Sequence, residues 1–247
     1  GLINCLESLV HQKYAGPITV KVLLKDFQDT AVPLLEKKFD LAFGQGAVRP
    51  KIVGNVTIEI LATGQGPKRD RLNQVIPSLT SVYTAILDAD HVADTGWIRG
   101  SVAKLEQDQT AHAVQAIRRP LSLSNLFQMW DSAQNHIGNE LLNKLYRIFG
   151  QSTFFTGTSC LFRTATLKTH PFSDCITEDT DLSYDMVLRR ERILHLADQG
   201  TREEVAPDFF SYIARRRRWS NGHNRTFFGH LWRIVASCPG FGTRIKL

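Results

Sequence analysis

The feature that most constrains the fold is the alternation of short β-branched runs with stretches that have helical apolar spacing. The runs at 18–24, 56–61, 82–87 and 111–117 are typical of buried strands. Helical stretches are expected at 2–12, 32–39, 67–76, 94–107, 121–149, 178–190 and from 209 onward. This alternation predicts an α/β fold with a mostly parallel sheet covered on both faces. Ligands of such sheets bind beyond the carboxyl ends of the strands.

Composition sets broad limits on the kind of protein. The chain has 247 residues, of which 43% are hydrophobic and 22% charged, as in an ordinary globular core. No apolar run approaches the roughly 18 residues that cross a bilayer. The four cysteines form no C-x-x-C pair, which favours reduced thiols and a cytosolic setting. The net charge of +6 weakly favours anionic partners.

Two acidic signals follow strands. Asp88-Ala89-Asp90 ends the run 82–87, and Asp26 follows the run 18–24. Because both lie at strand ends, we expect Asp26 and Asp88 to converge in one crevice. Hard divalent cations on a diphosphate prefer oxygen ligands, so Asp88 and Asp90 are candidates for a metal site. The alternatives are a capped turn for the tripeptide and a helix-capping loop for Asp26.

Lysine and arginine side chains open the helix predicted after Pro67. A cation is ill placed at a helix N-terminus for the helix dipole, but it is well placed if a phosphate docks there. Lys68 is therefore the first candidate for a nucleotide contact and Arg71 the second. For Arg69, a solvated basic turn is an equally good interpretation.

Two later motifs add a candidate base and a cationic cluster. Thr177-Glu178-Asp179 opens the helix 178–190, where acidic residues also serve as caps and dipole partners. Arg215 to Arg218 precede Trp219, and guanidinium suits phosphate while indole suits a sugar face. We expect Arg215 and Arg218 to face inward near Trp219, with Arg216 and Arg217 peripheral. A nucleic-acid or membrane patch is the alternative.

At these motifs the chain resembles the processive family 2 glycosyltransferases, the group of cellulose, chitin and hyaluronan synthases. That family carries an Asp after a strand, then D-x-D, T-E-D and Q-x-x-R-W. Phe154 to Thr158 is similar to its F-F-x-G-S/T segment. The resemblance covers nearly the whole chain. It departs at Arg215, where the family usually has Gln, and at the family's first strand, which is missing before Gly1.

The resemblance implies a GT-A-type three-layer α/β/α fold and a role for each motif. Residues 1–206 would form the nucleotide-sugar-binding and acceptor-binding domain, and 207–247 a helical segment with a membrane-proximal amphipathic end. Asp179 would be the catalytic base, assisted by Glu178 and Thr177. Donor contacts would come from Asp26, Lys68, Arg71, Asp88, Asp90, Arg215 and Arg218, with Asp88 and Asp90 on Mg²⁺ or Mn²⁺. Acceptor contacts would come from Trp219, Phe155, Thr156 and Gly157.

The implied activity is a metal-dependent, inverting hexosyl transfer from a UDP-sugar to a growing β-linked polysaccharide. The implied partners are the UDP-sugar, the glycan acceptor and a membrane, reached through flanking segments of the full-length protein at its cytosolic face, with no nucleic acid. Two alternatives are a non-processive family 2 transferase acting on a lipid or oligosaccharide and a sugar-nucleotide-binding regulatory module without turnover. The histidines show no metal spacing, and no metal is assigned to His91, His136, His195 or His223.

Overall fold

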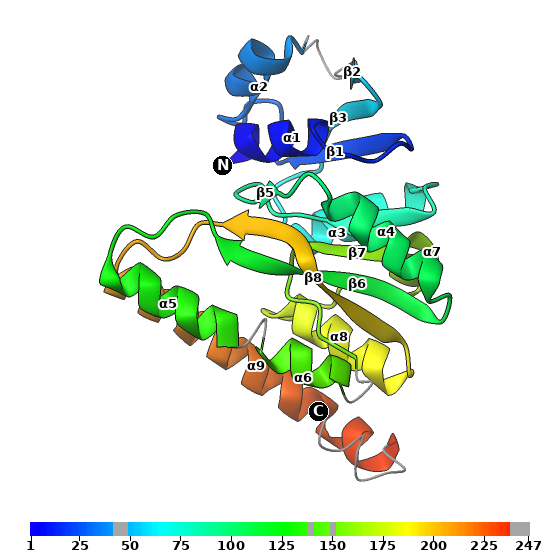
Figure 1. Cartoon of the computed structure of the whole chain (residues 1–247), viewed down its shortest axis with the longest axis vertical. Coiled ribbons are helices and arrows are strands. Elements are labelled where there is room, and N and C mark those ends of the chain that lie inside the picture. Colours follow the sequence, from blue (N-terminus) through cyan, green and yellow to red (C-terminus); the bar gives the residue numbers. More distant parts are fainter. Residues whose placement is uncertain (42–48, 138–140, 149–151, 238–247) are drawn as a thin grey trace.

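The computed structural model describes residues 1–41, 49–137, 141–148 and 152–237, which form two sheets and the helices around them (Figure 1). The smaller sheet has the strand order β1 (Ile18–Leu24), β3 (Val56–Ala62), β2 (Lys51–Val53). The larger sheet has the order β4 (Tyr83–Ile86), β7 (Cys160–Arg163), β6 (Ala111–Pro120), β8 (Arg192–Glu203), β5 (Val92–Ala93).

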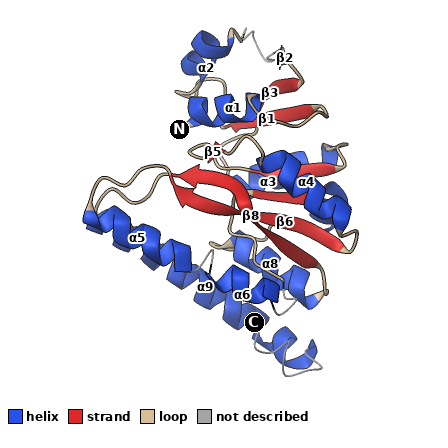
Figure 2. Cartoon of the chain, in the orientation of Figure 1, coloured by secondary structure: helices blue, strands red, loops and turns tan. Residues whose placement is uncertain are grey.

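The helices fall close to the predicted stretches, and Figure 2 shows them flanking the strands. They are α1 (Leu2–Val10), α2 (Val32–Phe39), α3 (Lys68–Val75), α4 (Trp97–Gln107), α5 (Leu126–His136), α6 (Leu142–Ile148), α7 (Thr164–Thr169), α8 (Glu178–Leu188) and α9 (Phe209–Ser237), with a 3₁₀ turn at Ile76–Ser78. The stretch expected at 121–149 is divided into α5 and α6. Its expected stop, Gly150, lies outside the described residues.

The sheets are mixed, so the expectation of mostly parallel pairing is wrong. β1 pairs parallel with β3 and β6 with β8, but β7 runs antiparallel to both β4 and β6. The edge strands β2 and β5 are also antiparallel to their neighbours. The difference arises because β2, β5 and β7 are only two to four residues long and carry no periodic signal. The antiparallel β7 brings its own beginning to the edge where β4, β6 and β8 end.

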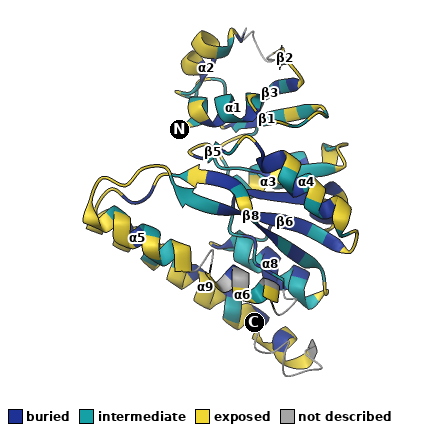
Figure 3. Cartoon of the chain, in the orientation of Figure 1, coloured by how far each residue is buried: buried dark blue, intermediate teal, exposed yellow. Residues whose placement is uncertain are grey.

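Alternating side chains of the larger sheet build one core on each face, which confirms the three-layer GT-A-type arrangement. Val114, Leu161 and Leu196 pack with Trp97 and other residues of α4. On the opposite face, a second cluster joins α3, α7 and α8 to the sheet through Ala113, Phe162, Ile193, Leu167, Leu182 and Met186. Figure 3 shows this buried layer running through the larger sheet.

The two sheets are separated between β1 and β4, each of which is an edge strand in the described residues. Helix α1 bridges the break. Its Leu6 packs on the smaller sheet, while its Cys5 and Leu9 pack with residues of the larger one. The Cys5 thiol also donates to the carbonyl of Asp88 at 3.7 Å. In the family that the chain resembles, the first strand would lie between the strands that carry Asp26 and Asp88, and this placement stays a prediction.

Helix α9 is the C-terminal element of the described chain and lies along α5 and α8 (Figure 1). It exposes several large apolar side chains, namely Phe209, Phe210, Ile213, Phe228, Leu231, Trp232 and Val235. None of the described helices combines the length and apolar character needed to cross a membrane. The last ten residues of the predicted amphipathic end, 238–247, lie outside the described residues.

Candidate active site

The predicted donor and catalytic motifs meet at the edge of the larger sheet where β4, β6 and β8 end. The ammonium group of Lys68 pairs with the Asp88 carboxylate and donates to the carbonyl of Gly157 at 2.7 Å. The backbone N–H of Asp88 donates to the Thr158 hydroxyl at 2.9 Å. Lys68 at the start of α3 therefore joins the D-x-D loop to the F-F-x-G-T loop, over 89 residues of sequence.

Asp88, Asp90 and His91 form a group that can hold a metal ion. One ligand atom from each lies within 4.8 Å of the others. The Asp90 side chain is 55% exposed, whereas that of His91 is 3% exposed. Two carboxylate oxygens suit Mg²⁺ or Mn²⁺, and an imidazole nitrogen is tolerated better by Mn²⁺. His91 was not expected in a metal group, yet its ring lies beside the two carboxylates, and its adjacency to the D-x-D tripeptide was the available signal.

The predicted base lies beside the same loop. Gly157 has φ of +84°, and a Cβ built there would come within 3.1 Å of the Asp179 Oδ2 atom. Only glycine tolerates both this left-handed backbone and the close carboxylate. Asp179 Oδ1 accepts from the backbone N–H of Thr180 at 2.8 Å. One carboxylate oxygen is thus held by the helix, and the other faces Gly157, whose carbonyl accepts from Lys68.

Glu178 differs electrostatically from its neighbour. Burial raises the pKa of its carboxyl, and the charge of Asp179 raises it further, while Lys68 and Arg69 oppose the shift. This places Glu178 in the same electrostatic neighbourhood as the cationic end of α3. A buried carboxyl with a raised pKa beside a second carboxylate is a common feature of sites that transfer protons.

Asp26 reaches this edge through the turn that precedes α3. The Gly64 N–H donates to the carbonyl of Lys25 at 2.9 Å, and the Gln65 side chain donates to Asp26 Oδ2 at 2.8 Å. Lys68 of the same segment pairs with Asp88, whereas Asp26 bonds to Gln65 at its beginning, so the convergence of Asp26 and Asp88 in one crevice stays a prediction. Arg71 donates to the carbonyl of Gly66 at 3.0 Å and so braces this turn.

Thr177 supports the site and does not face it. Its side chain is buried, and its hydroxyl lies 3.0 Å from that of Thr226 on α9. A Cβ built on Gly222 would come within 2.4 Å of the Thr177 Cγ2 atom, so α9 packs tightly against this residue. The sequence-based role of Thr177 in catalysis is therefore corrected to that of a packing contact between α8 and α9.

The predicted acceptor segment is partly core. Phe155 is 2% exposed and packs edge-on against Phe162 with ring centroids 5.2 Å apart. Its assignment as an acceptor contact is wrong, because its ring points into the core between sheet and α8. Thr156 donates its N–H to Gln115 at 3.1 Å, and its carbonyl accepts from Arg118 at 3.5 Å. Gly157 remains at the site edge beside Asp179.

The arginine motif is oriented differently from the expectation. Arg215 and Arg216 both pair with Asp131 of α5, a carboxylate whose side chain is 1% exposed. Their guanidinium groups stack on Trp219, at 5.1 and 5.5 Å from its ring centroid. Arg218 is exposed. The prediction of an inward Arg218 and a peripheral Arg216 is therefore wrong, because the anchor on this side is the buried Asp131.

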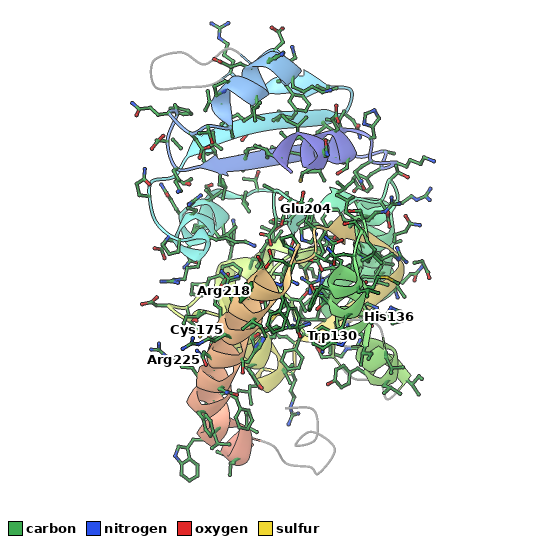
Figure 4. All side chains as sticks on the ribbon, turned by 90° about the vertical axis from the view of Figure 1, so that its left-hand side faces the viewer. Trp130, His136, Cys175, Glu204, Arg218 and Arg225 are labelled. Atoms are coloured by element: carbon green, nitrogen blue, oxygen red, sulfur yellow. The ribbon has the colours of Figure 1, made fainter. Side chains whose placement is uncertain are left out.

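Figure 4 shows how this orientation divides α9 into two flanks. Arg218 and Arg225 lie on the flank near Cys175, and Trp130 and His136 of α5 lie on the other side. Arg218 thus lies on the other flank of α9 from Trp130 and His136.

Comparison with known proteins agrees with the architecture. The family model described as "Glycosyltransferase like family 2" matches residues 2–222, and the chain belongs to this family. No curated protein sequence matches significantly.

Solved structures with the same fold have low sequence identity. A mannosyltransferase from Pyrobaculum calidifontis, solved with GDP-Man and Mn²⁺, is 17% identical with a TM-score of 0.68, over 93% of this chain and 60% of its own. TarS 1–349 from S. aureus, solved with UDP, is 15% identical with a TM-score of 0.58, over 98% of this chain and 64% of its own. The present chain thus spans less than two thirds of the length of these neighbours.

Proposed function

We propose that the chain transfers a hexosyl unit from a nucleotide diphosphate sugar, specifically a UDP-sugar, to a hydroxyl acceptor. The observation that carries this proposal is the assembly of Lys68, Asp88, Gly157 and Asp179 at one sheet edge. It supplies a cation for diphosphate, a carboxylate for a metal and a second carboxylate for a proton. The structural neighbours solved with GDP-Man or UDP support a nucleotide sugar as the donor class.

Asp88, Asp90 and His91 would hold the divalent cation. When bound, such a cation neutralises charge on the departing diphosphate. Lys68 is within reach of the same charge because its ammonium already lies on Asp88. Since that ion pair engages one Asp88 oxygen, Asp90 is the more available carboxylate for the metal. Asp26 follows β1 of the smaller sheet and accepts from Gln65, and these two residues are the proposed contacts of the uracil base.

Asp179 would accept the proton of the acceptor hydroxyl as it attacks the anomeric carbon. The attack comes from the face opposite the UDP group, so an α-linked donor gives a β-linked product. No second nucleophile is required. The backbone contact of Asp179 Oδ1 with Thr180 fixes the carboxylate while Oδ2 remains turned toward Gly157.

The finer proposal is that the product is a growing β-linked polysaccharide made at the cytosolic face of a membrane. Trp219, half-buried and stacked on two guanidinium groups, supports a rigid platform for a glycan. Exposed apolar side chains on α5 and α9, including Trp130, Phe210 and Trp232, support a membrane-facing surface.

The direct test feeds UDP-glucose, UDP-GlcNAc and GDP-mannose to the full-length protein and measures release of the nucleoside diphosphate and product length. We expect release from one UDP-sugar, and long products if synthesis is processive. Release from GDP-mannose alone would contradict the UDP assignment. Tight binding without release from any donor would identify a binding module in place of an enzyme.

A further inference from the structure

A polar cavity lies between the ends of β6 and β8 and the helix α5. Its volume is about 330 Å³ including the open mouth. The polar side chains of the lining are Arg118, Arg119, Ser132, Asn135, His136 and Glu203. None of these residues belongs to the sequence motifs.

The surroundings of this cavity carry more positive than negative charge. Arg118 pairs with Glu203, Arg119 and Arg202 share Asp94, and Arg215 and Arg216 share Asp131. The five arginines therefore face three carboxylates, an excess of two positive charges.

Hydrogen-bond acceptors are also in short supply here. In the described part of the chain, the buried Nε atoms of Arg118, Arg215 and Arg216 have no acceptor. Arg119 is 40% exposed, so its guanidinium can turn toward a ligand. Asn135 links the two halves of the cluster, because its side chain accepts from Arg216 at 3.2 Å while the residue lines the cavity. An anion would supply the missing acceptors, and guanidinium is well suited to bind it in bidentate fashion.

Two contacts link the lining of the cavity to the proposed active site. Glu203 lies 3.4 Å from the Nε2 atom of His91, which is adjacent to Asp90. Arg118 donates to the carbonyl of Thr156, one residue before Gly157, where a built Cβ would meet the Asp179 carboxylate. The lining is therefore connected to the segments that carry Asp90 and Gly157, while Lys68 approaches Asp88 from the α3 side.

We propose that the arginine cavity binds an anionic group of the acceptor, a phosphate or carboxylate carried near the hydroxyl that receives the sugar. This inference rests on the proposed function, since it names the acceptor class of the same site. The donor diphosphate is the other source of such an anion, and the experiment separates the two.

The test measures binding of inorganic phosphate to the full-length protein at constant ionic strength, with Mg²⁺ and saturating UDP present. We expect phosphate to bind together with UDP. Arg119→Gln should lower the affinity for phosphate about tenfold or more, as expected for a lost charge-assisted contact. Arg119→Lys keeps the positive charge but lacks the bidentate guanidinium, so its phosphate affinity should lie between those of the wild type and Arg119→Gln. Arg99→Gln, an exposed arginine on α4, is the matched control and should bind phosphate normally.

In turnover assays, phosphate should compete with the acceptor and not with the UDP-sugar. The inference is overturned if UDP displaces phosphate, if phosphate does not bind to the UDP complex, if Arg99→Gln loses as much affinity as Arg119→Gln, or if phosphate competes with the donor. Failure of UDP itself to bind would instead refute the proposed function, so the two failures are distinguishable.

Discussion

Two neighbouring regions of the molecule differ in how far their charged groups are paired and buried. The donor edge consists of Lys68, Asp88, Asp90 and Asp179, and the arginine cluster consists of the five arginines around the cavity with their three carboxylates. At the donor edge, Asp90 is 55% exposed and Asp88 39% exposed, and both carboxylates stand on a loop that follows a strand. In the arginine cluster, the carboxylate of Asp131 is 1% exposed and is held by two guanidinium groups from one helix. The first region leaves its carboxylates exposed, whereas the second pairs most of its charge within the protein.

Buried charge is retained in proteins only when it is paired, which explains the orientation of α9. Arg215 and Arg216 turn toward Asp131, and this rotates Arg218 to the surface. A cation motif on a helix therefore does not identify its ligand until its buried partners are known. A carboxylate motif that follows a strand indicates its ligand more readily, because the end of the strand fixes where the carboxylates lie.

The largest expected effect concerns the metal at the donor edge. Chelation with EDTA should abolish turnover of the full-length protein, and Mg²⁺ or Mn²⁺ should restore it. Asp90→Ala should be inactive at any metal concentration, because its carboxylate is the exposed member of the metal group. If Asp90→Ala turned over in EDTA at the wild-type rate, a metal bound by Asp90 would not be needed for the reaction.

The next largest expected effect concerns the proton acceptor, Asp179. Asp179→Asn keeps the shape and removes the base, so the rate should fall roughly 10²-fold or more with UDP affinity nearly unchanged. Asp174→Asn, an exposed acid close to the same helix, is the control and should keep its rate. A normal rate for Asp179→Asn, or lost UDP binding, would assign the residue a structural role.

Stability separates the two aromatic residues once grouped as acceptor contacts. Phe155→Ala removes a ring from the core and should lower the free energy of unfolding by about 3–5 kcal/mol. Trp219→Ala removes a half-buried ring and its cation–π contacts, so the loss should be smaller, about 1–2 kcal/mol. Chemical denaturation of both variants decides the matter, and a Trp219→Ala loss as large as that of Phe155→Ala would place this tryptophan in the core. Product length should nevertheless shorten for Trp219→Ala.

The smallest expected effect compares two glutamates, one from each region. The pKa of Glu178 is raised above its ordinary value of 4.5, so its ionisation costs stability above the raised pKa, and this cost disappears as the pH falls toward 4.5. The pKa of Glu203 is lowered below 4.5, so its ionisation stabilises the fold above 4.5, and that contribution is lost as the pH falls through the lowered value.

At neutral pH, Glu178→Gln should therefore raise the melting temperature and Glu203→Gln should lower it. Both differences from wild type should shrink in acid. Melting curves between pH 3 and 8 provide the measurement, and shifts of the same sign for both variants would show that the two regions do not differ in the way described.

The sequence predicted much of the fold because long elements carry periodic signals. The strands at 18–24 and 56–62 and the helices at 97–107 and 178–188 were predicted within a few residues. The antiparallel β7 between β4 and β6 was not predicted. A strand of four residues shows no hydrophobic periodicity, and the direction of a strand depends on long-range pairing. The pairing of Lys68 with Asp88 agrees with the predicted phosphate site at a helix start, whereas the role of Asp179 was implied only by the family resemblance.

The arginine side of the site was less predictable. Arg118 follows the strand expected at 111–117, and Glu203 lies outside every expected strand. Their pairing exists only after β6 and β8 align. Asp131 carried no motif, yet it decides which arginines face inward. Neighbouring buried charges of this kind are set by tertiary structure, so spacing along one helix does not reveal them.

The central claim is that the carboxylate edge, and not the arginine motif, holds the donor. Its most direct test is the affinity of the full-length protein for UDP with Mn²⁺, measured for Asp90→Ala and for Arg215→Gln, which restores the usual family residue. The account predicts a loss of tenfold or more for Asp90→Ala, equivalent to about 1.4 kcal/mol or more, and an affinity within about twofold of wild type for Arg215→Gln. The reverse result, with UDP affinity lost in Arg215→Gln and kept in Asp90→Ala, would contradict it.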